Sequence, residues 1–571
     1  MRNVVPGLLG LCLCAAIVPF GAVEFHHALF AFGFAGLLAL IWAGKLLFAR
    51  TPLWKPSPMH WPVFGFVVYT VMRYWFSPYE YESRLETFQI VLYGLVYFIA
   101  ANNVNRGRER TVVLGILLVL GTAEAMYGIW QGYTKSYYTL NAERPSVFSF
   151  RGSGTFICPN HLAGLLEMVL GFALARLALY RPADRESIEV QLLNKVTLAY
   201  ALIAMIVGLL LTFSRGGWFA TAIGLVVFLA WGGFRGRAMW RQLAAGAGAL
   251  CVLVLLLFAI PSTRNYLRLT MSPKTEEASV PLREPSLKGR TVLWSATWRI
   301  IQDHPILGTG VGTWQWVHQK YREPAMQATA DYAHNDILQT TSEYGVVGAG
   351  LIVAVLIGFY RHARRLGTEG VTSEQRAFAM GALLAVTILL VHSWFDFNLH
   401  IPGNALFFCA ILGLVAGMEV PEGPYSARPL KPPMRYGLVV GLLLLVGLGM
   451  HFIVPTARAV QYTETGNMEK RYLHWDDAIA WYEAALDADP KYPEPHIKLG
   501  DIYFRQAQFR VGEDKKQERL ELCEKAIKRY RAAFEMNRSR GDLLSKIAWT
   551  YEIAGDADRA RKSFELALLL D

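Results

Sequence analysis

The chain has 571 residues, of which 53% are hydrophobic and only 18% are charged, and its formal net charge is +11. A soluble domain has about 25% charged residues, so this composition excludes an ordinary water-soluble enzyme for most of the chain. The basic excess lies before Arg458, because residues 458–571 contain 20 Lys and Arg against 21 Asp and Glu. The excess of Lys and Arg is therefore typical of the loops that orient membrane helices and does not indicate a nucleic-acid surface.

Apolar runs of membrane-spanning length recur along most of the chain. A helix that crosses the hydrocarbon needs about 20 apolar residues, and about thirteen such runs occur. They lie at 5–22, 28–48, 61–77, 86–101, 111–131, 160–180, 194–213, 217–233, 242–260, 345–360, 378–395, 402–418 and 436–454. The sequence therefore predicts an all-α, polytopic membrane protein, and we interpret the first run as a span and not as a cleaved signal.

The loops between these runs alternate in charge. Six loops that fall on one side are basic: Lys45/Arg50/Lys55, Arg106/Arg108/Arg110, Arg181/Arg185, Arg235/Arg237/Arg241, Arg361/Arg364/Arg365 and Arg428/Lys431/Arg435. Basic loops stay in the cytoplasm, which places the N-terminus there and the residues after the last span outside. We therefore predict a bacterial inner-membrane protein with outer loops at 132–159, 214–217, 261–344 and 396–401.

Several ionisable residues lie within or beside the predicted spans. Arg73, Glu124 and Glu167 lie toward the outer side, and Asp396 and His400 flank the last outer loop. Ionisable residues at membrane depth are candidates for function, although internal ion pairs are an equal alternative. A transporter more often has its site at midplane between inverted repeats, and we see no such repeat.

The first outer loop contains the only metal-ligand grouping that we considered. Glu24, His26 and His27 have suitable side chains, but three neighbours without further ligands are a weak signal. The six cysteines show no disulfide framework or metal-binding spacing. We therefore predict no metal and no cofactor.

A tight outer turn, Ser214–Gly217, joins two predicted spans. The second span begins in this turn, so its unpaired N–H groups and positive dipole end face outward. Gly216 allows an anion to approach the backbone, and Arg215 adds a fixed positive charge. The turn therefore indicates phosphate binding, against the alternative that Arg215 is an ordinary interfacial arginine.

The long outer segment 261–344 contains two further candidates. Arg290, Trp294 and Trp298 would lie on one face of a helix, which makes Arg290 a candidate for binding. The alternative is an amphipathic helix that lies on the membrane surface with its tryptophans in the interface. The glycine-rich run before residue 313 lacks the Lys-Ser/Thr ending of a nucleotide-binding loop. If one helix covers the end of the segment, His334 and Glu343 lie on opposite faces and do not form a catalytic pair.

The C-terminal part contains a repeat. Three similar segments begin at Ala478, Ala526 and Ala560, and the last two are 34 residues apart, which is the tetratricopeptide period. The first interval is 48 residues, so we infer an insertion. We predict a transmembrane domain at 1–456 and a periplasmic tetratricopeptide repeat (TPR) domain at 457–571. Such arrays bind protein partners on a concave face, and the alternative is a stabilising appendage.

Five segments together resemble the O-antigen ligase/polymerase superfamily. They are FRGSGTFICPNHLAG (150–164), SRGGW (214–218), GRTVLW (289–294), DHPILGTGVGTW (303–314) and HNDILQTTSEYGVVG (334–348). The resemblance implies a membrane glycosyltransferase of the GT-C-like class. Its reaction transfers a glycan from an undecaprenyl-pyrophosphate carrier to an acceptor hydroxyl, without a metal, at the outer face of the inner membrane.

The resemblance also suggests roles for individual residues. Arg215 and Arg290 would offset the charge that accumulates on the pyrophosphate. His334 would accept the proton of the acceptor hydroxyl or would hydrogen-bond the pyrophosphate, and the sequence does not separate these roles. Other donor-side candidates are Arg151, Asn160 and Gly216, and possible supporting residues are Glu124, Glu167 and Arg73.

The acceptor remains open between three classes. Ligation to a lipid A-core is our first choice, followed by glycan polymerisation and by transfer to a protein hydroxyl. Two non-enzymatic alternatives are a transporter of lipid-linked glycans and a membrane scaffold that recruits proteins through the TPR array. The predicted partners are the lipid-linked donor, the acceptor, membrane lipid and proteins bound by the TPR domain, and nucleic acid is not among them.

Overall fold

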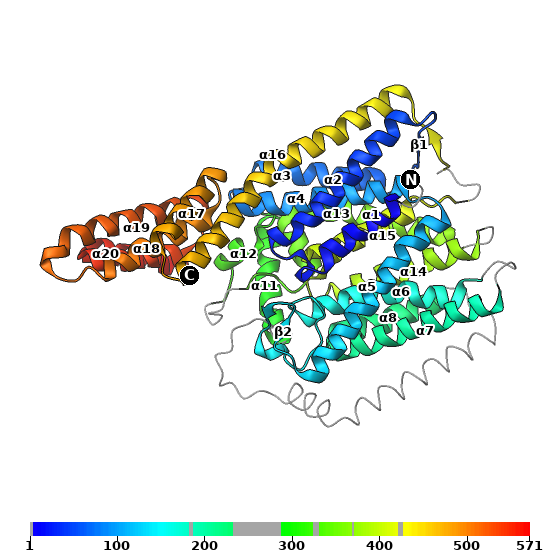
Figure 1. Cartoon of the computed structure of the whole chain (residues 1–571), viewed down its shortest axis with the longest axis horizontal. Helices are drawn as coiled ribbons and strands as arrows, with labels where there is room; N and C mark the ends of the chain where they lie inside the picture. The colour runs from blue at the N-terminus through cyan, green and yellow to red at the C-terminus, as the bar shows by residue number, and fades with distance from the viewer. Residues whose placement is uncertain are drawn as a thin grey trace.

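The computed structural model describes residues 4–181, 187–231, 287–323, 330–367, 371–420 and 426–570. These residues are almost entirely helical. Figure 1 shows a bundle of long helices and an arm of shorter helices that projects from one side of it. The run predicted at 242–260 lies outside the described residues.

Every other predicted run coincides with a helix of the bundle. These helices are α1 (Val4–Ile17), α2 (Phe25–Phe48), α3 (His60–Trp75), α4 (Glu80–Asn103), α5 (Gly107–Thr134), α6 (Pro159–Leu179), α7 (Ile188–Leu211), α8 (Arg215–Trp231), α13 (Asp336–Leu366), α14 (Ser373–His392), α15 (Pro402–Ala416) and α16 (Pro432–Arg471). Among the described residues, 8 helices are long and apolar enough to cross a membrane, and α1, α8 and α15 are shorter apolar helices. The all-α, polytopic fold class is confirmed, but the number of thirteen spans is not.

Short elements connect the bundle helices. The strands β1 (Leu53–Trp54) and β4 (Arg428–Pro429) pair, as do β2 (Tyr138–Thr139) and β3 (Ala142–Glu143). The remaining connecting helices are η1 (Phe20–Ala22), η2 (Ser146–Phe148), α11 (Leu287–Asp303), α12 (Trp314–Val317), η3 (His318–Lys320) and η4 (Asn398–His400). The β1–β4 pair joins two of the basic loops, which therefore lie at the same end of the bundle.

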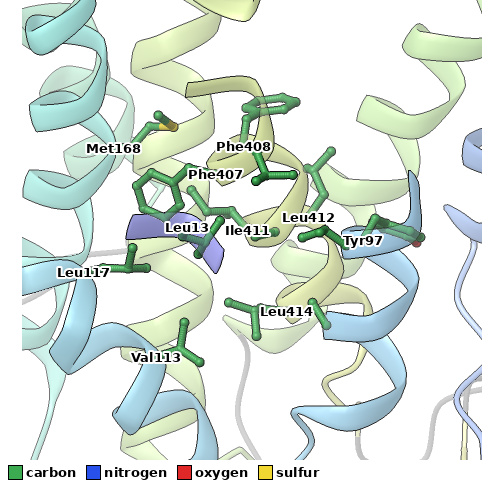
Figure 2. Close-up of a cluster of buried hydrophobic side chains, with 14 of the residues drawn as sticks. Leu13, Tyr97, Val113, Leu117, Met168, Phe407, Phe408, Ile411, Leu412 and Leu414 are labelled. Carbon is green, nitrogen blue, oxygen red and sulfur yellow. The ribbon is translucent and has the colours of Figure 1, made fainter. Parts of the chain in front are cut away.

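The core of the bundle surrounds α15, which is apolar on all sides and is therefore buried. Figure 2 shows Phe407 and Ile411 of this helix beside Leu13 of α1, within the same buried cluster as residues of α4, α5 and α6. A side chain at Gly413 would collide with the carbonyl oxygen of Tyr97. This glycine therefore permits the close approach of α4 and α15.

The helix α13 is interrupted near its start. Gly345 has a φ of 63° and a ψ of −170°, and the segment before α12 fills the break. Val346 donates its backbone N–H to the carbonyl oxygen of Pro305 at 2.8 Å, and Arg73 donates to that of Gly308 at 3.1 Å. One continuous helix does not cover the end of the outer segment, because α13 begins only at Asp336.

The arm contains the repeat that the sequence predicts. It consists of the C-terminal half of α16, α17 (Trp475–Ala488), α18 (Pro493–Gln508), η5 (Glu513–Lys515), α19 (Lys516–Met536), α20 (Gly541–Ala554) and α21 (Ala557–Leu570). Gly466 of α16 lies against the ring of Tyr482, and Gly500 lies in the same way against Tyr530. Because α16 passes from the bundle into the arm without a break (Figure 1), the predicted boundary at 456/457 falls inside a helix.

The arm is fastened to the bundle by buried polar contacts. Arg84 of α4 donates to Asp489 at 2.8 Å, and the hydroxyl of Thr456 donates to the same carboxylate at 3.0 Å. The hydroxyls of Tyr79 and Ser539 are 2.7 Å apart. We call these contacts the Asp489 seam. They place the arm on the ends of α4 and α16 that lie opposite the basic loops.

Candidate functional site

The candidate site is built around the carboxylate of Asp396, which follows α14 and is 1% exposed. Asn160 donates its side-chain N–H to Asp396 at 2.6 Å, and the backbone N–H of Phe397 donates at 2.9 Å. The Nδ1 atom of His334 lies 3.4 Å from the carboxylate, and the Nη2 atom of Arg290 lies 4.0 Å from it. Residues from three other segments therefore converge on one buried acid, and we call this group the Asp396 cluster.

The backbone of His334 adopts an unusual conformation. Its φ is 50°, a left-handed value that costs free energy for a residue with a side chain. The indole N–H of Trp294 donates to its carbonyl oxygen at 3.3 Å, and its ring packs edge-on to Phe397 at 4.8 Å. The Nδ1 atom is enclosed next to Asp396, whereas Nε2 is neither enclosed nor hydrogen-bonded within the described residues. The ring therefore presents Nε2 as its available nitrogen.

Arg290 is held by a backbone contact and not by a close acid. Its Nη1 donates to the carbonyl oxygen of Phe395 at 2.5 Å, and its Nε is enclosed without a hydrogen bond. At 4.0 Å, Asp396 attracts the guanidinium but forms no hydrogen bond with it. The positive charge of Arg290 is therefore only partly offset by its surroundings.

The charge of Asp396 follows from these neighbours. Burial by itself would raise the pKa of the carboxyl group, but the contact with His334 and the charge of Arg290 act in the opposite direction. Together they hold the pKa of Asp396 well below its usual range. The carboxylate therefore stays ionised at neutral pH.

Arg151 and Asn160 belong to the same cluster. Arg151 donates to the side-chain oxygen of Asn160 at 2.7 Å and to the carbonyl oxygen of Thr212 at 2.7 Å. Arg151 thereby fixes the orientation of the Asn160 amide, whose N–H groups face Asp396. Sequence reasoning placed both residues on the donor side. In the structure their polar groups are directed to Asp396 and to the backbone near the 214–217 turn.

Glu124 holds the loop that carries Arg151. Its carboxylate accepts from the backbone N–H and from the hydroxyl of Thr155, both at 2.8 Å. A side chain at Gly154 would collide with this carboxylate. Glu124 therefore does not contact Asp396 but fixes the loop whose Arg151 orients Asn160.

The Ser214–Gly217 turn packs against a second buried histidine. His392 lies 3.1 Å from Glu167 through Nδ1 and 3.3 Å from the hydroxyl of Ser214 through Nε2. Added Cβ atoms would lie 3.1 Å from His392 at Gly216 and 2.6 Å from Glu167 at Gly217. Both glycines therefore make room for this pair. The prediction that Gly216 admits an anion stays a prediction.

Arg215 lies on the exposed side of the same turn. Its neighbour Gly216 lies against Phe395, because a Cβ there would be 3.3 Å from the Cβ of that residue. Phe395 is also the residue whose carbonyl oxygen accepts from Arg290. Arg290 of α11 and Gly216 of α8, which follows Arg215, therefore both lie against Phe395.

A third histidine–acid pair lies next to the cluster. His400 contacts Asp336 at 2.6 Å through Nδ1 and lies 4.0 Å from Glu343 through Nε2. Burial lowers the pKa of His400, but the hydrogen bond to Asp336 and the charges of Asp336, Glu343 and Glu86 raise it to about 9. The backbone N–H of Asp336 donates to the carbonyl oxygen of Asp396 at 3.2 Å. This pair therefore fixes the main chain beside Asp396.

The sequence motifs identified some of these residues and missed others. His334 and Arg290 meet at Asp396. The single helix from which we argued that His334 and Glu343 lie on opposite faces does not form, because α13 begins only at Asp336. Arg73 holds the backbone of the 305–310 segment and lies outside the cluster. We missed His392 and Asp336. Asp336 follows His334 by two residues within a quoted motif, whereas His392 ends an apolar run that by itself shows no sign of function.

Within the described parts of the chain, two groups of residues have the side chains of metal ligands. In each, the potential ligand atoms lie within 4.8 Å of one another. The groups are Glu24/His26/His27 and Glu469/His474/Asp477. Neither includes a residue of the Asp396 cluster. Both groups are partly exposed, and exposed acidic groups of this kind are common in proteins without a bound ion.

Two segments of the chain match known families. Residues 200–353 match the O-antigen ligase family, and residues 474–506 match the TPR repeat. No curated protein matches the chain. The first match includes Arg215, Arg290 and His334, whereas Asn160 and Asp396 lie outside it.

Proposed function

We propose that this membrane protein, which carries an O-antigen ligase domain and a TPR repeat, transfers a glycan from an undecaprenyl-pyrophosphate carrier to an acceptor hydroxyl. The reaction takes place at the outer face of the bacterial inner membrane and contributes to surface polysaccharide biosynthesis. The observation that carries the proposal is the convergence of Arg290, His334 and Asn160 on the buried Asp396.

The reaction breaks the bond between the anomeric carbon of the glycan and the pyrophosphate oxygen. A new bond forms between that carbon and the acceptor oxygen, and the acceptor hydroxyl loses its proton. The undecaprenyl pyrophosphate leaves with the bonding electrons and with additional negative charge. The site must therefore supply positive charge on one side of the anomeric carbon and a proton acceptor on the other.

Arg290 and Arg215 supply the positive charge. The charge of Arg290 is only partly offset, and no described residue forms an ion pair with the exposed Arg215. Arginine suits this role because its planar N–H groups match two phosphate oxygens at once. In this proposal the two arginines stabilise the leaving group, so the reaction needs no metal.

His334 acts as the proton acceptor. Asp396 contacts the Nδ1 side of the ring, which leaves Nε2 to receive the proton of the acceptor hydroxyl. The ionised Asp396 then stabilises the imidazolium that forms. The alternative role is a hydrogen bond from His334 to the pyrophosphate, and the kinetics of Asp396→Asn distinguish it from proton acceptance.

A transfer assay with the purified full-length chain tests this assignment. With a carrier-linked glycan and an acceptor, His334→Ala and Arg290→Ala should each reduce transfer by at least about 100-fold. The matched controls His304→Ala and Arg299→Ala change exposed residues of the same outer segment and should retain activity. Full activity in both cluster variants, at equal amounts of folded protein, would refute the enzymatic proposal.

The same assay separates the acceptor classes. Ligation, our first choice, predicts transfer to a lipid A-core acceptor. Polymerisation predicts longer glycans on the carrier itself, and protein glycosylation predicts transfer to a hydroxyl-bearing polypeptide. The product that accumulates when all three acceptors are offered together identifies the preferred class.

The proposal also requires an orientation. The cluster and the arm must face the periplasm, and the basic loops must face the cytoplasm, as the charge pattern predicts. A reporter that is active only outside the cytoplasm should give a signal after Leu570 and none after Arg365. The opposite pattern would place the cluster in the wrong compartment for a periplasmic transferase.

A further inference from the structure

A large apolar groove lies apart from the Asp396 cluster. Its volume is about 1280 Å³, and its walls come from α2, α3, α4 and α16. Leu37, Val91 and Leu448 are typical of its lining, and no residue of the Asp396 cluster belongs to it. Ordinary ligand pockets measure about 300–1,000 Å³, so this groove has room for a ligand larger than most small molecules.

The helix α16 packs loosely in this region. Only 11% of its most apolar window is buried in the protein, against 28% to 72% for the other candidate spans. Its exposed residues there are apolar, so in a membrane they contact hydrocarbon. Leu448, Met450 and Phe452 line the groove and are 56%, 62% and 45% exposed, so the groove is open to the lipid that surrounds α16.

Glycines widen the groove. A Cβ added at Gly33 or Gly36 of α2 would meet no atom within 4 Å, and at Gly449 of α16 the nearest atom is at 3.9 Å. All three glycines line the groove. Small residues in membrane helices usually permit close helix packing. Here they face open space and leave room for a ligand.

The mouth of the groove is polar and lies beside the Asp489 seam. Arg84 and Arg458 both line it, but Arg84 is committed to Asp489. Arg458 is exposed and forms no ion pair with a described residue. The wall from Leu445 to Arg458 is about 20 Å long at 1.5 Å per residue. That length exceeds the hydrocarbon depth of one leaflet, about 15 Å.

We propose that this groove binds an anionic phospholipid of the surrounding bilayer. Its hydrocarbon chains lie between α2 and α16, and its phosphate pairs with Arg458. Because α4 and α16 both continue from the groove into the Asp489 seam, the bound lipid also stabilises the docked position of the arm. This site does not depend on the proposed transfer reaction.

Lipid retention by the full-length chain tests the proposal. The protein is reconstituted in nanodiscs of equal parts phosphatidylglycerol and phosphatidylcholine, extracted in mild detergent and analysed by native mass spectrometry. We expect phosphatidylglycerol to be retained selectively. Arg458→Gln should reduce this retention about tenfold, as loss of one phosphate contact would.

Variants that fill the groove provide a second measurement. Leucines in the double variant Gly33→Leu/Gly449→Leu would occupy the space of the hydrocarbon chains and should abolish retention. Gly441→Leu is the matched control, because it lies on α16, has no atom within 4 Å of an added Cβ and does not line the groove. Hydrogen exchange in α17 and α18 should rise in the filled variant and stay unchanged in the control.

Two results would overturn the proposal. The first is equal retention of phosphatidylglycerol in the wild type and in Arg458→Gln, which remains informative even if the filled variant does not fold. The second is displacement of phosphatidylglycerol by undecaprenyl phosphate at the same mole fraction, which would assign the groove to the carrier lipid. Neither measurement involves glycan transfer, so both results leave the proposed function to its own test.

Discussion

Two buried aspartates hold remote segments of this protein together in different ways. Asp489 accepts hydrogen bonds from Arg84 at 2.8 Å and from Thr456 at 3.0 Å. Asp396 accepts from an amide and from a backbone N–H, whereas the side chains of Arg290 and His334 stay at 4.0 and 3.4 Å from it. The arginine of the seam is hydrogen-bonded to its acid, and the arginine of the cluster is not.

The difference suggests two roles: Asp489 docks the arm, and Asp396 belongs to a site for chemistry. A close, hydrogen-bonded pair satisfies both charges and resists separation, which is useful where two domains must stay docked. A cation held at a distance by other contacts keeps N–H groups for a ligand, which is useful where a pyrophosphate must bind and leave. The following predictions test this distinction, from the largest expected effect to the smallest.

Removing one partner of the seam should have the largest effect on stability. Arg84→Gln leaves Asp489 buried without its cation, and such a loss costs about 3–5 kcal/mol. The expected result is a lower free energy of unfolding and undocking of the arm, measured by denaturant titration and by hydrogen exchange in α17. The control Asp487→Asn changes an exposed acid of α17, two residues before Asp489, and should have little effect. An unchanged exchange rate in Arg84→Gln would show that other contacts dock the arm.

The His400–Asp336 pair should make stability depend on alkaline pH. The folded-state pKa of His400, about 9, lies above the ordinary value of 6.5. Its contribution is therefore complete below pH 6.5 and is lost as the pH rises through 9, with a magnitude of a few kcal/mol. The thermal midpoint of the wild type should fall over this range. The slope should be flatter in His400→Gln and unchanged in His304→Gln.

Neutralising the acid of the cluster should impair transfer more than stability. Asp396→Asn keeps the size of the side chain but removes the charge that stabilises the imidazolium of His334. We expect a decrease of about 10- to 100-fold in kcat, with KM for the donor changed less. An increase in donor KM with normal kcat would instead support the role of His334 in binding the pyrophosphate.

The smallest effect should come from a conservative change at the exposed arginine. Arg215→Lys keeps the positive charge but loses the paired N–H groups that match phosphate oxygens. We expect kcat/KM for the carrier-linked donor to fall about tenfold, with unchanged thermal stability because the side chain is exposed. Wild-type kinetics in this variant would show that Arg215 provides only long-range charge.

Local patterns predicted much of the fold. The repeated alanines Ala478, Ala526 and Ala560 are all 0% exposed, because a residue at a fixed position of each repeat meets the same neighbour every time. The apolar runs likewise became helices, since spanning length and composition are properties of a single segment. We did not predict that α16 is continuous. A proline usually ends a helix, but Pro455 lies inside this one.

The candidate site divides in the same way. The sequence by itself identified the motifs that carry Arg215, Arg290 and His334, because motif and charge pattern are read along the chain. Only the tertiary structure decided that Arg290 and His334 share the acid Asp396 and that His392 and Glu167 pack against the glycine turn. Those contacts join helices that are far apart in sequence, and their partners depend on how the bundle packs.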